Sequence, residues 1–209
     1  MGKKFTEIEP KHREFIEKQQ IFFVASATAE SRVNVSPKDA ASLRVLSPQR
    51  VVYLDQTGSG NETAAHLRAD GRLTLMFCAL KGAPLILRLY GKGTSLQRDT
   101  AAYAEILSAH YAAVEPPGAR QIVVLDVDLV QTSCGYGVPA FGYEGERPTL
   151  RRWAEAKGAD GLREYRRTKN AVSIDGLPTG VLDGLDRDTG GEASAASVLD
   201  PCASQKPVE

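Results

Sequence analysis

The chain has 209 residues, enough for one large domain or for a domain with a tail. Its 26 Lys and Arg residues balance 26 Asp and Glu residues, and a net charge of zero argues against nucleic acid or an anionic membrane as a partner. The three cysteines, Cys78, Cys134 and Cys202, have neither a disulfide pattern nor zinc-site spacing, so we expect a cytoplasmic protein with reduced cysteines and no metal.

The first two thirds of the chain predict short strands with few helices between them. A short helix is expected over 12–20, and two more are expected near Asn61 and over 100–113. β-Branched and alternating apolar residues, bounded by Gly, Pro and Asp, predict strands over 21–29, 31–38, 50–56, 72–80, 85–97 and 121–132. This order predicts a mainly β fold with flanking helices (α+β), an antiparallel barrel and not a parallel sheet.

The pattern changes after Pro148. Residues 149–170 predict a helix that is broken between Gly158 and Gly161, with its basic residues facing solvent. From about Asp183 the chain has no aromatic residue, which predicts a flexible tail. We therefore expect a barrel over 1–137, a helical extension packed on it over 138–182, and a tail over 183–209. The N-terminus is too polar for a signal peptide, and no apolar run approaches transmembrane length.

The stretch TGSGNETAAHLR, residues 57–68, has two interpretations. Ser59 followed three residues later by Glu62 is typical of a capping box, which would satisfy only the helix's own N–H groups. A helix N-terminus with further short polar side chains, here Asn61 and Thr63, is also suited to a phosphate. The third glycine of a dinucleotide fingerprint is missing, and there is no G-K-[ST] sequence of a P-loop.

Other polar residues stand out against apolar strands. Lys38 in SPKD ends the second predicted strand, where it can complete an anion site begun by Asn61 and Thr63. Arg88 and Asp55 interrupt or end apolar strands, so each either faces solvent or is buried against a partner. The Gly- and aromatic-rich segment 132–143 is either a packed loop or a backbone that approaches a flat ligand. The three histidines, His12, His66 and His110, are isolated and indicate no metal site.

The ordered series VNVSPKD, VVYLD, GSGNETAAHL, RLTLMF and LRLYGKG resembles the pyridoxamine 5′-phosphate oxidase-like family. The resemblance runs from about residue 10 to about residue 137 and ends in SCGYGVP, which is typical of one uncharacterised subfamily. It implies an FMN-binding split β-barrel that forms a homodimer with the flavin between the subunits. An open barrel also has sheet edges and apolar strand faces that need covering.

By this resemblance, Asn34 through Lys38 contact the flavin, and Asn61, Glu62 and Thr63 begin the phosphate-binding helix. Glu62 and Thr63 stand where the vitamin-forming oxidases carry an Arg-Lys pair, so Glu62 is expected to point away into the helix cap. Arg88 is expected near the N1–C2=O edge of the ring, and Cys134 to Tyr136 over the ring or the dimer seam. The residues expected around the cofactor are Asn34, Val35, Ser36, Lys38, Asp55, Asn61, Thr63, Arg88, Ser133, Cys134, Gly135 and Tyr136.

The resemblance implies an FMN-dependent oxidoreductase acting on an unknown small molecule, with no catalytic residue identified. The C-terminal arginine signature that grips pyridoxamine phosphate in the true oxidases has no clear counterpart, so that oxidase activity is not expected. Two alternatives stay open: a deazaflavin-dependent reductase, and a non-catalytic flavin- or haem-binding module.

Overall fold

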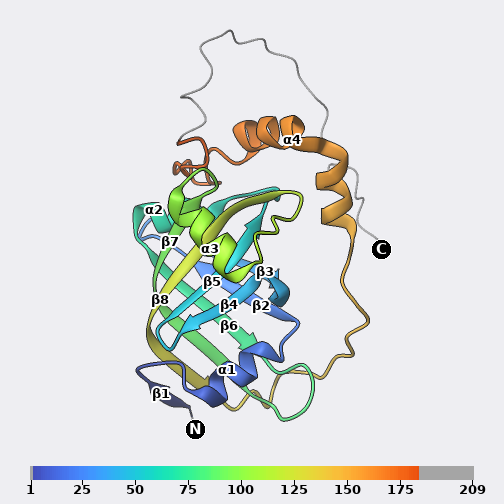
Figure 1. Cartoon of the computed structure of the whole chain (residues 1–209). Coiled ribbons are helices and arrows are strands. Elements are labelled where there is room, and N and C mark those ends of the chain that lie inside the picture. The colour runs from blue at the N-terminus through green and yellow to red at the C-terminus, as the bar shows by residue number, and fades with distance from the viewer. Residues whose placement is uncertain (1, 184–209) are drawn as a thin grey trace, which may run out of the picture.

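The computed structural model describes residues 2–183 and contains one eight-stranded antiparallel sheet with four α-helices around it (Figure 1). The strands are β1 (Lys3–Phe5), β2 (Ile21–Ser26), β3 (Asn34–Asp39), β4 (Leu43–Ser47), β5 (Arg50–Gln56), β6 (Arg72–Cys78), β7 (Ile86–Gln97) and β8 (Ala119–Ser133). The helices are α1 (Pro10–Glu17), the short 3₁₀ helix η1 (Ala40–Ser42), α2 (Glu62–Ala69), α3 (Ala101–His110) and α4 (Thr149–Lys169). Except for Asp183, the predicted tail lies outside the described residues, and so does Cys202.

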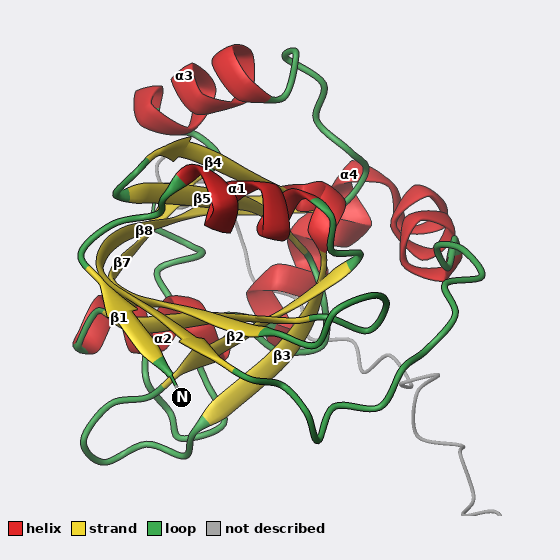
Figure 2. Ribbon diagram, turned by 90° about the horizontal axis from the view of Figure 1, so that it is seen from below, coloured by secondary structure: helices red, strands yellow, loops and turns green. Residues whose placement is uncertain are grey.

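The sheet curls into an open barrel. Its strand order is β3-β2-β6-β7-β8-β5-β4, with β1 added to β8, so β3 and β4 are its two ends. Figure 2 shows the curled sheet with α1 beside its open side and α3 outside β4 and β5. The predicted split antiparallel barrel with flanking helices is confirmed. Strands β1 and β4 were not predicted, since they have only three and five residues and β4 follows a segment that resembles a turn.

The barrel interior is filled by every second residue of each strand, as the period of two requires. In β2, Phe22 and Val24 are fully buried inside, whereas Phe23 and Ala25 face outward and are half-buried. A second apolar cluster, including Val52, Leu54 and Tyr103, fills the space between β5, β8 and α3. The fold therefore has a core on each side of β5, which holds the end of this strand in place.

The helix after Pro148 has the predicted break, because Gly158 has φ +65°, a conformation that favours glycine. Trp153 and Tyr165 pack edge to face at 5.0 Å, and Leu162 is buried. The prediction that all basic residues of this helix face solvent was wrong for Arg166. Arg166 is buried because its guanidinium binds Thr57 Oγ1 at 2.8 Å and the Ala119 carbonyl at 2.7 Å. The extension is thereby tied to the barrel.

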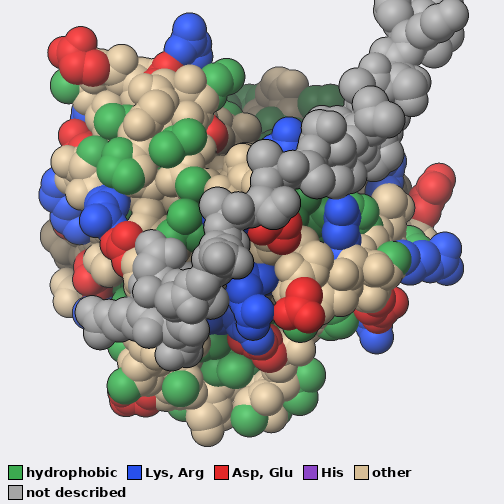
Figure 3. Space-filling view, turned by 90° about the horizontal axis from the view of Figure 1, so that it is seen from above, with side chains coloured by type: hydrophobic (Ala, Val, Ile, Leu, Met, Phe, Trp, Pro, Cys, Tyr) green, Lys and Arg blue, Asp and Glu red, His purple; other side chains and the backbone are tan. Residues whose placement is uncertain are grey.

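The surface agrees with the balanced composition. On the face shown in Figure 3, acidic and basic side chains lie close to one another across the surface. No helix in the part of the chain that the structure describes has the length and apolarity needed to cross a membrane.

Candidate functional site

A polar cavity of about 300 Å³ opens where β3, the end of β5 and the start of α2 meet. It is lined by Asn34, Ser36, Lys38, Asp55, Gln56, Gly58, Ser59, Gly60, Asn61, Glu62, Thr63 and Arg120. Six of the twelve residues expected around a cofactor therefore share one cavity: Asn34, Ser36, Lys38, Asp55, Asn61 and Thr63.

Strand alternation explains the contribution of β3. Asn34, Ser36 and Lys38 lie opposite Ser26, Val24 and Phe22 of β2, all of which face the barrel interior. The intervening Val35 points to the other face and is 60% exposed. Because β3 is at one end of the curled sheet, its inward side chains border the open side of the barrel and stay half-buried.

The base of the cavity is an ion cluster centred on Asp55, which is 3% exposed. Lys38 Nζ donates to Asp55 Oδ1 at 2.7 Å, and Arg120 donates to Asp55 Oδ2 through Nη2 at 2.6 Å and Nε at 3.1 Å. Burial alone would raise the pKa of Asp55, but the charges and hydrogen bonds of Arg120 and Lys38 lower it well below its usual range. Asp55 is therefore a fixed anion. It ties Lys38 of the end strand β3 to β5, the neighbour of the other end strand β4.

The start of α2 supplies donors and differs from the predicted cap. The helix begins at Glu62 with Asn61 at the N-cap position, and no side chain caps it. The predicted capping box was wrong, because Ser59 lies two residues before the N-cap and is exposed. The Glu62 carboxylate enters no helix cap: both of its oxygens accept the N–H of Ile174 in the extension at 3.1 Å. The first N–H groups of a helix have no partner within the helix.

Asn61 carries a buried donor without a partner. Its side chain is 2% exposed, and Oδ1 accepts from Gln121 Nε2 at 2.8 Å. This orientation is fixed because Gln121 Nε2 also donates to the Asp55 carboxylate at 2.9 Å, and a carboxylate can only accept, so the Gln121 amide nitrogen faces Asn61. Asn61 Nδ2 then has no partner among the described residues. A buried unsatisfied donor costs about 1–3 kcal/mol and calls for an explanation, such as a ligand acceptor.

A chain of hydrogen bonds sets the direction of the hydroxyl groups in the cavity. Asn34 Nδ2 donates to Thr63 Oγ1 at 3.1 Å, so the Thr63 proton can go to another acceptor, either the buried Tyr53 hydroxyl or a ligand. Ser36 Oγ donates to Asn34 Oδ1 at 3.1 Å, so Ser36 offers a ligand only its lone pairs. Behind them, Ser26 Oγ lies 3.0 Å from His66 Nδ1, and both residues are buried. At the cavity, Thr63 can thus serve as a donor, and Ser36 can serve as an acceptor.

The remaining predicted residues gather elsewhere. Arg88 lies on β7 in register with Met76, which pairs with Phe23, so it is on the outer face of the sheet. Arg88 is half-buried, and its Nη1 donates to Ser133 Oγ at 3.2 Å. Of the two expected environments, solvent or a partner, Arg88 therefore has the second. The neighbouring Cys134 and Tyr136 are exposed, whereas Gly135 packs against Leu85. The structure does not bring this second group to the cavity within one chain.

Three residues that hold the cavity lining in place were missed. Arg120 and Gln121 begin the apolar strand β8 and bind Asp55 and Asn61, and Asn170 of the extension binds Arg120 Nη1 at 2.8 Å. A signal for Arg120 was present, since it is a charge at the start of an apolar strand, as Asp55 is at the end of one. Asn170 has no comparable signal in the sequence.

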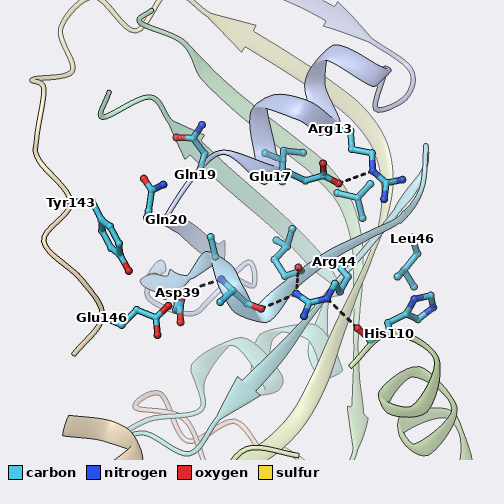
Figure 4. Close-up of a pocket in the computed structure, with 15 residues that line it drawn as sticks. Arg13, Glu17, Gln19, Gln20, Asp39, Arg44, Leu46, His110, Tyr143 and Glu146 are labelled. Carbon is cyan, nitrogen blue, oxygen red and sulfur yellow. Dashed lines mark hydrogen bonds and ion pairs between the residues drawn. The ribbon is translucent and has the colours of Figure 1, made fainter. Parts of the chain in front are cut away.

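A larger hollow of about 480 Å³ lies between α1, β4 and the segment after β8 (Figure 4). Its cations already have partners: Arg13 pairs with Glu17 at 2.8 Å, and Arg44 donates to the carbonyls of Ala41 and His110 at 2.8 and 3.1 Å. None of the residues that line this hollow has a buried polar side-chain atom without a partner, whereas Asn61 does at the smaller cavity. The smaller cavity is therefore the better candidate site.

The donors at the smaller cavity fit an anion. Lys38 keeps two ammonium protons free beyond the one given to Asp55, Asn61 keeps an amide, Thr63 keeps a hydroxyl, and α2 adds its first N–H groups. These groups come from β3 and the start of α2, both of which line the cavity. A phosphate group has the acceptor oxygens that such a set requires.

Comparison with known proteins assigns the chain to a family. The model for pyridoxamine 5′-phosphate oxidase matches residues 8–134. The pyridoxamine 5′-phosphate oxidase family protein ustO of Aspergillus flavus is 39% identical over 182 residues, covering 79% of this chain and 73% of that protein.

A solved structure of low sequence identity has the same kind of fold. The HupZ protein of Group A Streptococcus has a TM-score of 0.50 at 17% identity and covers 60% of this chain and 99% of its own. An FAD binding protein from Mycobacterium smegmatis has a TM-score of 0.42 at 12% identity, covering 62% and 97%. With the family model spanning most of the barrel, the chain belongs to the pyridoxamine 5′-phosphate oxidase family.

Proposed function

We propose that the chain is an FMN-binding flavoprotein that acts as an oxidoreductase on a small molecule. The observation that carries the proposal is the set of free donors at the cavity, above all the buried Asn61 Nδ2. The phosphate of FMN would accept from Lys38 Nζ, Asn61 Nδ2, Thr63 Oγ1 and the first N–H groups of α2. Asp55 and Arg120 would serve by fixing Lys38 and the cavity floor.

A bound flavin supplies hydride or electron transfer, while the protein supplies binding and orientation. Asn34 is half-buried beside the cavity and is fixed by three hydrogen bonds, to Ser26, Thr63 and Ser36. Its orientation is therefore set before a ligand arrives, which lowers the cost of binding. In this proposal Asn34 borders the ring end of the ligand.

The charge balance favours one phosphate over a longer anionic tail. The cavity lining contains two cations, Lys38 and Arg120, and two carboxylates, Asp55 and Glu62. Because these charges cancel, an anion would be held largely by neutral hydrogen-bond donors and by the helix N-terminus. A deazaflavin with a charged tail would gain little from this lining, so FMN is the better match.

We also propose a homodimer with the flavin at its interface. Residues Phe23, Met76, Tyr90 and Leu129 on the outer face of the sheet are half-buried, and Val35 beside them is exposed. Apolar side chains gathered on one outer strand face are suited to a contact with a second copy. Arg88 and the segment Ser133 to Tyr136 are on or next to this face. In a dimer formed through this face, they would contact the flavin bound in the cavity of the second copy.

The absorbance spectrum of the purified protein tests the proposal. We expect a yellow protein with flavin bands that releases FMN, and not FAD, when denatured by heat. A colourless protein that takes up no added FMN, or a porphyrin spectrum, would refute it. Sedimentation of the FMN-loaded protein as a monomer would refute the dimer alone.

A further inference from the structure

The C-terminal extension is built into the back of the cavity. Asn170 is fully buried, at 0% exposure. Its Oδ1 accepts from Arg120 Nη1 at 2.8 Å, and its Nδ2 donates to the Gly58 carbonyl at 3.0 Å. Both partners line the cavity. One side chain of the extension therefore fixes two parts of the cavity wall at once.

Further contacts hold the same loop. Arg120 Nη1 also donates to the Gly60 carbonyl at 2.9 Å, and Arg166 binds Thr57. Burial lowers the pKa of Arg166 to about 10, as do the nearby charges of Arg98 and Arg120, yet it remains a cation at neutral pH. All these anchors act on residues 57–60, the loop that leads into α2.

This loop needs outside anchors because of its composition. Gly58 and Gly60 give it many backbone conformations, and a Cβ added at Gly58 would meet no atom within 4 Å. Close packing around Gly58 therefore does not fix the loop, whereas the hydrogen bonds to its carbonyls do. A loop held in its binding conformation costs less entropy when a ligand binds.

We infer that Asn170 is a positioning residue for the anion site, acting through Arg120 and the Gly58 carbonyl without contact with the ligand. The inference rests on the proposed FMN function and extends it beyond residues 8–134, the range of the family match. It assigns to the extension a role in holding the phosphate end of the ligand in particular.

The test compares FMN with riboflavin, which lacks the phosphate, by flavin fluorescence titration. Asn170→Ala should weaken FMN about tenfold and leave riboflavin within about twofold, since the side chain removed supports groups near the phosphate only. Thr179→Val is the matched control. Thr179 is 2% exposed and donates to the Asn170 carbonyl at 2.7 Å, but its side chain does not reach the cavity. This control should keep the wild-type ratio of FMN to riboflavin affinity.

The outcomes separate the two proposals. If the wild-type protein binds no FMN, the proposed function fails and the inference fails with it. If the wild type binds FMN but Asn170→Ala weakens both flavins equally, or Thr179→Val changes the ratio as much, Asn170 has only a structural role. Should Asn170→Ala not fold, Asn170→Ser keeps a polar group at the buried position. The same selective loss of FMN is expected for it, and an unchanged ratio overturns the inference.

Discussion

Replacing Lys38 by Met removes the ammonium but keeps most of the apolar stem. In the structure the Lys38 side chain is 26% exposed and donates one hydrogen bond to Asp55. Hydrogen bonds to a charged group contribute about 1.5–3 kcal/mol, which corresponds to about 10- to 150-fold in affinity. Because solvent partly screens this ammonium, we expect Lys38→Met to weaken FMN by about 10- to 50-fold. Asp55 keeps Arg120 and Gln121 as partners, so the fold should persist.

Flavin fluorescence titration of FMN and of riboflavin measures the effect. Riboflavin affinity should change by less than about twofold, because riboflavin has no phosphate to pair with the ammonium. Lys18→Met is the control: Lys18 pairs with Glu14 at 2.6 Å, a similar distance, but both side chains are 68% exposed on α1. If Lys38→Met weakens both flavins alike, or neither, the phosphate does not bind beside Lys38.

Three further predictions follow from particular residues. Asn61→Asp keeps the acceptor for Gln121 but replaces the free donor by an anion, so FMN should weaken more than about 100-fold in the same titration, with riboflavin much less affected. Arg120→Leu leaves Asp55 buried with fewer partners and should lower the free energy of unfolding by about 3–5 kcal/mol, measured by urea denaturation; a loss below about 1 kcal/mol would contradict the role given to the ion cluster. Burial lowers the pKa of His12 in the folded protein, so as the pH falls the unfolded chain binds the proton first. The free energy of unfolding should therefore decrease as the pH drops below 6.5, the ordinary pKa of a histidine. His12→Gln should flatten that part of the urea-denaturation profile between about pH 7.5 and about pH 5.5, and an unchanged slope would contradict the assignment.

Much of the fold could be predicted from the sequence because the strands have a strong period of two. The same alternation explains why Phe22 and Val24 lie inside and why Asn34, Ser36 and Lys38 face one side while Val35, which was expected at the cofactor, faces the other. The start of α2 was harder. Ser59 and Glu62 have the spacing of a capping box, but the contact of Glu62 with Ile174, which is 112 residues away, takes the carboxylate elsewhere. A local sequence pattern gives no sign that a distant segment will bind the same side chain.

The site was predicted in part for a similar reason. Residues near one another on β3 and α2 could be grouped by the order of their motifs, and six of them share the cavity. Arg88 and Ser133 could not be placed, because which face of β7 a residue occupies depends on the register with β6 and β8. Asn170 reaches the cavity only because α4 returns over the loop at 57–60, and no local pattern indicates that path.

A crystal structure of the protein soaked with FMN tests the central claim most directly. We predict the phosphate within hydrogen-bonding distance of Lys38 Nζ, Asn61 Nδ2 and Thr63 Oγ1, at the N-terminus of α2, with the Asp55–Arg120 pair unchanged behind it. FMN bound with its phosphate outside this cavity, or Asn61 Nδ2 still without an acceptor in the complex, would contradict the assignment of the site.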